Sequence, residues 1–245
     1  MRLFLLIVTL ISVIGCAKPK LEPPRVTAEP GIYRISDGET LTETELWAAL
    51  SGARVVLVGE SHDSASDHSV QLDVLKSAAS GKAVGLGMEM FQRPFQPVLD
   101  MFVAGDLDEE EMLAQTEWEE RWGFETDLYR PLWQLARDRG LPIVALNARR
   151  ELTKRIAKVG VAGLTDAEKA DLVELDLSDE KDRAWLKSVF RSPGAKMDDK
   201  KIDNYFEAQL TWDETMADTA ARWVMTHPEA TLIVAVGRGH VERDW

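Results

Sequence analysis

Four short apolar runs constrain the fold of this chain more than any other feature. Each run is continuous rather than alternating between apolar and polar residues, which is typical of strands buried on both faces of a parallel sheet. Stretches with helical spacing of apolar residues separate the runs. The sequence therefore predicts an α/β fold with a mostly parallel sheet flanked by helices. The predicted strands span residues 54–59, 83–90, 142–147 and 231–237.

Helical patterns fill most of the remaining chain. Helices are predicted at 64–81 and 128–140, each ending at a glycine. The long stretch between the third and fourth runs carries no strand pattern, which predicts an inserted, bundle-like helical subdomain at 148–228. The α/β domain then comprises residues 31–147 and 229–245. The helices expected in the subdomain span 149–158, 165–175, 180–191 and 198–226, and a capping box of Thr165 and Glu168 opens the second.

The N-terminus has the pattern of an export signal. Arg2 precedes an apolar run of 12 residues, which is shorter than the about 20 residues that span a membrane but suits a signal peptide. The segment before Cys16 resembles a bacterial lipobox. Residues 1–15 are therefore expected to be a lipoprotein signal peptide, and Cys16 the acylated first residue of the mature chain. The proline-rich residues 16–30 are expected to form an extended tether.

Lipidation implies attachment to the bacterial cell envelope. Ala17 follows the cysteine, which by the sorting convention of Gram-negative cells favours the outer membrane. Cys16 is the only cysteine, so no intrachain disulfide can form. The formal net charge of −13 disfavours nucleic acid as a partner, because a duplex-binding surface needs clustered Lys and Arg.

Two strand ends carry the same Val-Gly-x-x-His pattern. The segments are VGESH and VGRGH, which end at His62 and His240. In an open α/β sheet, ligands bind beyond the carboxyl ends of the strands, where both segments are expected to lie. Gly59 and Gly237 are expected to let the backbone turn sharply out of the strand. The pattern therefore predicts that the two histidines face one cavity.

Charged residues accompany these segments. Glu60 lies at the end of the first strand, and Glu89 lies within the apolar second strand, where a charge is costly unless it is paired or bound to a cation. Arg149 is expected in the first turn of a helix, where the helix dipole disfavours a cation. It is therefore predicted to serve a ligand or a buried acid, with pairing to Glu151 or a neighbouring helix as the alternative. His68 is expected on an exposed or half-buried helix face, in a structural role.

Several segments together resemble the ChaN-type haem-binding, iron-regulated lipoproteins. They are VVLVGESHDS, GLGMEMFQRPFQPVLDMF, PIVALNARRE, YFEAQLTWDETMA and IVAVGRGHV, and the likeness runs from about residue 50 to the end. The resemblance implies an α/β domain carrying a helical subdomain, lipid attachment to the envelope and a role in haem or iron acquisition. The wider superfamily, which includes erythromycin esterases and Tiki-type metalloproteases, shares two Gly-x-x-His motifs and paired glutamates. The glutamates here are Glu60 and Glu89.

Haem binding is the first functional interpretation. Haem iron takes His, Cys, Met or Tyr ligands in proteins. With the only cysteine acylated, tyrosine or histidine is left as the iron ligand, and Tyr205 on the last predicted helix is the tyrosine best placed. Lys200 and Lys201 lie one turn earlier. Together with Arg149 or His62, they would meet the haem propionates by charge-assisted bonds.

The same helix is expected to offer apolar surface to a porphyrin. Phe206, Trp212 and Met216 flank the tyrosine along the sequence. An exposed haem face would also favour a haem-dependent homodimer, because a large apolar ligand seeks a second wall. Ordinary packing of Tyr205 on a helix is the alternative. Haem or a related tetrapyrrole is thus the expected ligand.

A divalent-metal hydrolase is the second interpretation. Two imidazoles and two carboxylates at the strand ends are a set suited to Zn or Mn. One glutamate would ligate the metal while the other activates a metal-bound water as general base. The sequence has no His-Glu-x-x-His motif, so the haem-binding interpretation is preferred and enzymatic activity is left open. The candidate ligands are His62, His240, Glu60 and Glu89.

Overall fold

The computed structural model describes residues 31–81, 83–178, 180–190 and 198–241. The predicted signal peptide at 1–15 and the tether at 16–30, with Cys16, lie outside the described residues. The chain divides into two compact units, Met1–Leu46 and Trp47–Trp245. None of the helices within the described ranges is long and apolar enough to cross a bilayer.

The described part of the first unit is a small antiparallel hairpin. Strands β1 (Ile32–Arg34) and β2 (Glu39–Leu41) pair with each other. The turn between them contains Gly38, whose φ of +72° is a left-handed conformation that favours glycine. Helix α1 (Glu43–Leu50) begins directly after the hairpin.

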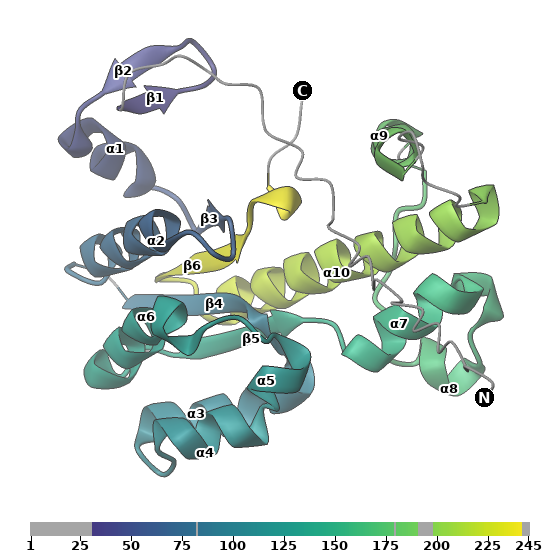
Figure 1. Ribbon diagram of the computed structural model, residues 1–245. Helices are drawn as coiled ribbons and strands as arrows, with labels where there is room; N and C mark the ends of the chain where they lie inside the picture. The colour runs from purple at the N-terminus through teal and green to yellow at the C-terminus, as the bar shows by residue number, and fades with distance from the viewer. Residues whose placement is uncertain (1–30, 82, 179, 191–197, 242–245) are drawn as a thin grey trace, which may run out of the picture. The chain divides into compact units, whose positions relative to one another are not determined.

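The second unit contains a four-stranded sheet (Figure 1). Its strand order is β3-β6-β4-β5, and every neighbouring pair is parallel. The predicted α/β fold with a mostly parallel sheet is confirmed, and each of the four apolar runs forms one strand. The last strand in the chain lies between the first two strands of this sheet. The strands are β3 (Val55–Glu60), β4 (Ala83–Gln92), β5 (Ile143–Asn147) and β6 (Ala230–Gly237).

Helices cover both faces of the sheet, as strands without polar alternation require (Figure 1). On one face lies the larger core, in which Phe91 and Trp133 are fully buried. On the other face, α10 (Asp199–Thr226) packs Met216 against Val234 and its neighbours. Each large apolar side chain buried in this way contributes roughly 1.5–3 kcal/mol. The helices around the larger core are α2 (Ala65–Ala78), α3 (Gln96–Ala104), α4 (Glu109–Gln115), α5 (Trp118–Arg121) and α6 (Thr126–Arg139).

The helices between β5 and β6 lie close to where the sequence predicts them. The piece predicted at 165–175 is the exception, because only its first part is helical, although the predicted capping box is present. The N-terminal half of α10 packs Ala208 against Ile156 in a small separate core, so α10 contributes to two cores. The division of residues 148–228 into a subdomain stays a prediction. The remaining helices are α7 (Arg150–Val159), α8 (Asp166–Lys169) and α9 (Glu180–Phe190).

Candidate functional site

The two Gly-x-x-His segments meet at the carboxyl end of the sheet. Strands β3 and β6 are adjacent, with Glu60 opposite Gly237. A Cβ atom on Gly237 would lie 2.7 Å from His62 Cε1 and 3.3 Å from Glu89 Oε2, so both side chains lie against this glycine. His240, in the short helical turn after β6, places its Nε2 atom 3.2 Å from Glu89 Oε1. Both histidines therefore lie close to Glu89. That they face one cavity stays a prediction, because the cavity of about 260 Å³ beside His240 does not include His62 in its wall.

The two glycines serve a different purpose from the predicted one. Gly237 has φ −60° and ψ 136°, a conformation that other residues adopt freely, and Gly59 is not among the residues with positive φ. Space is the constraint instead. A Cβ atom on Gly59 would lie 2.8 Å from Val241 Cγ2 and 3.2 Å from Arg238 Cα. The predicted turn role is wrong, because these glycines allow a close approach of neighbouring groups rather than an unusual backbone conformation.

Glu60 lies at the centre of a buried polar group, here named the Glu60 cluster, with His62, His68 and Tyr129. Glu60 is 1% exposed. Its Oε1 atom accepts hydrogen bonds from His62 Nδ1 at 2.8 Å and from the Tyr129 hydroxyl at 2.9 Å. Its Oε2 atom lies 3.0 Å from His68 Nδ1, an ion-pair contact without hydrogen-bond alignment. Burial raises the pKa of Glu60, but its contacts with these three residues outweigh burial and lower the pKa to about 2.

His68 is a member of the site that the sequence reasoning missed. The expected exposed or half-buried position is wrong, because His68 is 4% exposed. Its Nε2 atom lies 3.3 Å from the carbonyl oxygen of His62. Burial lowers the pKa of His68, but Glu60 and this backbone oxygen outweigh burial and raise the pKa. The one signal in the sequence is that His68 follows His62 by six residues, inside the first turns of α2.

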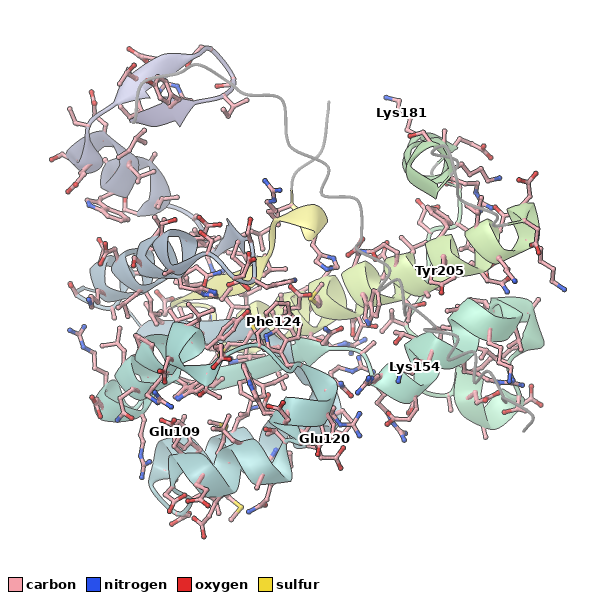
Figure 2. All side chains as sticks on the ribbon, viewed as in Figure 1. Glu109, Glu120, Phe124, Lys154, Lys181 and Tyr205 are labelled. Atoms are coloured by element: carbon pink, nitrogen blue, oxygen red, sulfur yellow. The ribbon has the colours of Figure 1, made fainter. Side chains whose placement is uncertain are left out.

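Tyr129 and two other aromatic side chains also escaped the sequence reasoning. Tyr129 of α6 packs edge-on to the His68 ring, with 4.4 Å between ring centroids. Burial, followed by the charge of Glu60, raises the pKa of the Tyr129 hydroxyl, which therefore stays protonated. Trp122 lies edge-on to the His62 ring at 4.8 Å, and Phe124, labelled in Figure 2, lies 5.0 Å from that ring. These contacts fix the orientation of His62.

The proton on His62 can be placed from its partners. The ionised carboxylate of Glu60 can only accept a hydrogen bond, so His62 Nδ1 carries a proton. The Nε2 atom is then the nitrogen available to accept a proton or a donor. The His62 side chain is 33% exposed, so solvent reaches the ring. Its predicted contact with haem propionates stays a prediction.

His240 is held by carboxylates on both sides of its ring. We name His240, Glu89, Asp213 and Gln209 the His240 cluster. The His240 Nε2 atom faces Glu89, and its Nδ1 atom contacts Asp213 Oδ1. The Gln209 amide lies 3.2 Å from the same Nδ1 atom. Glu89 Oε2 accepts the backbone N–H of Gly237 at 2.5 Å. Burial lowers the pKa of His240, but Asp213 and Glu89 outweigh burial and raise the pKa to about 10, so the ring is an imidazolium at neutral pH.

The predicted zinc or manganese site is not supported by this arrangement. Glu60 is engaged by the groups of its own cluster, and Glu89 by His240 and a backbone N–H. His240 uses both ring nitrogens in contacts with carboxylates. Within the part of the chain that the structure describes, no three His, Cys, Asp or Glu side chains are grouped to hold a metal ion. The predicted ligands pair with one another instead of turning toward a common point.

Arg149 is separate from both clusters. It precedes α7 as its N-cap residue, rather than lying in the first turn, and its guanidinium pairs with Asp171 at 2.8 Å. Both side chains are about half exposed, so the predicted service to a buried acid is wrong. The alternative partner Glu151 pairs with Arg121 at 3.0 Å, and the charge of Arg149 acts on Glu151 as well. A role for Arg149 in haem binding stays a prediction.

Tyr205 lies on the same face of α10 as two members of the His240 cluster. Residues four apart on a helix are neighbours, and Tyr205, Gln209 and Asp213 follow one another at this spacing. Tyr205, labelled on α10 in Figure 2, is 43% exposed. Lys200 and Lys201, in the first turn of the helix, are exposed too. The predicted roles of these three residues in haem binding stay predictions.

The apolar surface predicted beside Tyr205 is mostly core. Phe206 is buried beneath the Arg183 guanidinium, which lies 4.6 Å from the centre of the ring. Met216 is buried against the sheet, and Trp212 packs partly buried on the same core. The prediction that Phe206 faces a porphyrin is therefore wrong, because Arg183 covers the buried ring. Met216 lines a cavity of about 260 Å³, so its contact with a porphyrin stays a prediction.

This chain is similar to a family of known sequences and to solved structures. The sequence model of a family described as "Haem-binding uptake, Tiki superfamily, ChaN" matches residues 46–245. A solved structure described as "Cofacial heme binding to ChaN of Campylobacter jejuni" has a TM-score of 0.66 at 16% identity, with 84% of this chain and 79% of that chain covered. RRSP, a MARTX toxin effector domain from Vibrio vulnificus CMCP6, has a TM-score of 0.47 at 14% identity, with 81% and 30% covered. No curated protein sequence matches this chain.

The likeness to the Campylobacter jejuni structure is one of fold, whereas the family match is one of sequence. That match includes both Gly-x-x-His segments, Glu89 and all of α10. It also spans most of the chain. This protein therefore belongs to the ChaN haem-binding uptake family of the Tiki superfamily.

Proposed function

We propose that this protein binds haem at the envelope of a bacterial cell and takes part in haem or iron acquisition. The observation that carries the proposal is the match of residues 46–245 to a haem-binding uptake family. The fold likeness to ChaN of Campylobacter jejuni, whose structure is described as binding cofacial haem, supports it.

The residues on α10 fit a haem ligand. Haem iron accepts a tyrosine oxygen as an axial ligand, and Tyr205 is 43% exposed on this helix. Lys200 and Lys201, one turn earlier, supply exposed cations that can pair with propionates. We therefore assign the iron ligand to Tyr205 and the propionate contacts to the two lysines. His62 and Arg149 are kept as further candidates for the propionates.

Titration of the purified mature protein with haemin tests this assignment. We expect a saturable shift of the Soret band that Tyr205→Phe abolishes or displaces, because a phenylalanine has no oxygen to bind iron. Tyr33→Phe is the matched control, since Tyr33 is a tyrosine of similar exposure, 38%, on β1. The absence of any spectral change at micromolar protein would contradict the proposal.

Lysine variants test the propionate contacts separately. Exposed ion pairs of this kind contribute about 0.5–1 kcal/mol each, so the double change Lys200→Ala with Lys201→Ala should weaken haemin binding roughly tenfold. Lys76→Ala on α2 removes an equally exposed cation and should change nothing. Equal haemin affinity in the unchanged protein, the double lysine variant and Lys76→Ala would exclude the two lysines from the haem site.

The proposal includes a lipid anchor on Cys16 and a haem-dependent homodimer. The lipobox-like segment supports the anchor, and Cys16→Ala should move the protein from the detergent phase to the aqueous phase on phase partition. Size-exclusion chromatography with and without haemin tests the dimer. An elution volume that is unchanged while haemin is bound would contradict it.

A further inference from the structure

Helix α10 leaves the edge strand β3 partly uncovered on its own face of the sheet. Successive residues of a strand point to opposite faces, and Val56 and Val58 lie in the larger core on the other face. Val55 and Leu57 therefore point to the α10 face, where Val55 packs on the smaller core. Leu57 is 57% exposed. An open space is thus left between α10 and the middle of β3.

A cavity of about 260 Å³ occupies this space. Its wall is mostly apolar and includes Leu57 of β3, together with Val234 and Val236 of β6. On α10, the cavity is lined by the small side chains of Ala217 and Ala220, which leave room that larger residues would fill. An apolar cavity of about 150 Å³ binds benzene, so this cavity has room for a larger apolar body, such as two fused rings.

The charged part of the wall has an excess of carboxylates. The cation of His240 is contacted by two carboxylates, those of Asp213 and Glu89, so the His240 cluster keeps a net negative charge. Asp176 adds a second negative charge, because its carboxylate accepts hydrogen bonds from Ser178 that lower its pKa. These charges attract a cation and repel an anion. The charged residues of the wall are Asp176, Asp213, Glu214 and His240.

We propose that this cavity binds an apolar organic cation, a molecule with an apolar body and one protonated amine. The apolar body lies between α10 and β3, and the ammonium group faces the carboxylates of the wall, with Asp176 as its exposed partner.

This site is separate from the one that we propose for haem. Tyr205 and the two lysines precede Leu210, which is the first residue of α10 in the cavity wall. Haem propionates are anions, which the carboxylates beside the cavity disfavour. The inference therefore does not depend on haem binding, and a ligand of the cavity is expected to bind whether or not Tyr205 is present.

Calorimetric titration of the full chain with three naphthalene compounds tests the proposal. They are 2-naphthylmethylamine, which is protonated at neutral pH, the uncharged 2-naphthylmethanol and the anionic 2-naphthoate. We expect saturable, sub-millimolar binding of the amine. The alcohol should bind about two- to fivefold more weakly, the size of one exposed ion pair. The anion should bind most weakly.

Two substitutions separate the apolar part of the site from the charged part. Ala217→Phe, at an exposed position of α10, fills the cavity and should abolish binding of both the amine and the alcohol. Ala114→Phe, at an exposed position of α4, is the matched control. Asp176→Asn should weaken the amine about two- to fivefold and leave the alcohol unchanged. Tyr205→Phe should change neither affinity.

Several outcomes would overturn the proposal. These are no binding of the amine, an affinity for the anion that equals that for the amine, unchanged binding in Ala217→Phe or Asp176→Asn, or loss of binding in Tyr205→Phe. Circular dichroism shows whether each variant is folded. If Ala217→Phe is not, the methyl NMR signals of Val234 and Val236 in the unchanged protein must still shift on adding the amine. Protein that binds haemin but not the amine would overturn this inference and leave the haem proposal standing.

Discussion

The two Gly-x-x-His segments have the same spacing and lie on adjacent parallel strands, yet their histidines are held in opposite ways. In the Glu60 cluster, one carboxylate accepts two hydrogen bonds and makes an ion-pair contact with His68, and its pKa falls to about 2. In the His240 cluster, one imidazole is contacted by two carboxylates, and its pKa rises to about 10. The same motif therefore stabilises a buried anion at the end of one strand and a partly buried cation just after its neighbour. The protonation state follows from the number and sign of the groups around a residue, and the motif does not set it.

Removal of one buried charge from each cluster should give the largest difference in the free energy of unfolding between the two clusters. Glu60→Gln leaves the buried His68 without its anion, and we expect a loss of about 3–5 kcal/mol in the free energy of unfolding. Glu89→Gln should cost less, about 1–3 kcal/mol, because Asp213 still contacts His240. Urea unfolding at neutral pH measures both. Equal losses would show that the two carboxylates are equivalent and would break the comparison.

The two clusters should also limit stability at opposite ends of the pH range. Glu60 has a folded pKa of about 2, below its ordinary 4.5, so its contribution is present above pH 4.5 and is lost as the pH falls toward 2. His240 has a folded pKa of about 10, above its ordinary 6.5, so its contribution is present below pH 6.5 and is lost as the pH rises toward 10.

Unfolding curves across this pH range, with one variant for each cluster, separate the two effects. Glu60→Gln should flatten the fall in stability on the acid side and leave the alkaline side unchanged. His240→Gln should do the reverse. A variant that flattens the opposite side would mean that the protonation states assigned to the two clusters are interchanged.

The glycines at the two strand ends provide a smaller and more local test. Gly237→Ala places a Cβ atom 2.7 Å from the His62 ring, and Gly59→Ala places one 2.8 Å from Val241 Cγ2. Each overpacked site should cost about 1–3 kcal/mol, measured as a lower melting temperature. Only Gly237→Ala should displace the His62 ring proton signals in an NMR spectrum. Displacement by Gly59→Ala as well would show that His62 responds to the whole strand end.

Aromatic contacts with histidine should have the smallest effect. Trp122 is edge-on to His62 at 4.8 Å, whereas Trp223 is stacked on the exposed His227 at 4.2 Å. Aromatic pairs contribute about 0.5–1.5 kcal/mol beyond the area that they bury. We expect Trp122→Phe to cost an amount in this range and to broaden the His62 ring signals. Trp223→Phe is the comparison and should leave His62 unchanged.

The fold was largely predictable because its signals are local. The strands that precede His62 and His240 are continuous apolar runs, and the glycine that ends α6 and the capping box that opens α8 are short-range patterns. The position of both histidines near Glu89 was also predictable, since carboxyl ends of parallel strands lie at one edge of a sheet. The predicted length of the helix at 165–175 is wrong, because a capping box specifies where a helix begins and not where it ends.

The composition of the two clusters was not predictable in the same way. His68, Tyr129 and Asp213 come from α2, α6 and α10, and their distances from Glu60 or His240 depend on how these helices pack on the sheet. The predicted metal ligands have residue types that suit Zn or Mn. In the structure, however, their carboxylates and imidazoles pair with one another instead of pointing to a common metal position. Residue type alone does not distinguish these arrangements.

The sequence by itself determined which segments become strands and helices, and which chemical groups stand at the strand ends. Only the tertiary structure decided which of these groups touch. The insertion of β6 between β3 and β4 brought His240 beside Glu89, and the packing of α10 brought Asp213 to the other ring nitrogen of His240. The physical reason is that secondary structure depends on neighbours along the chain, whereas charge and proton position depend on neighbours within a few ångströms in space.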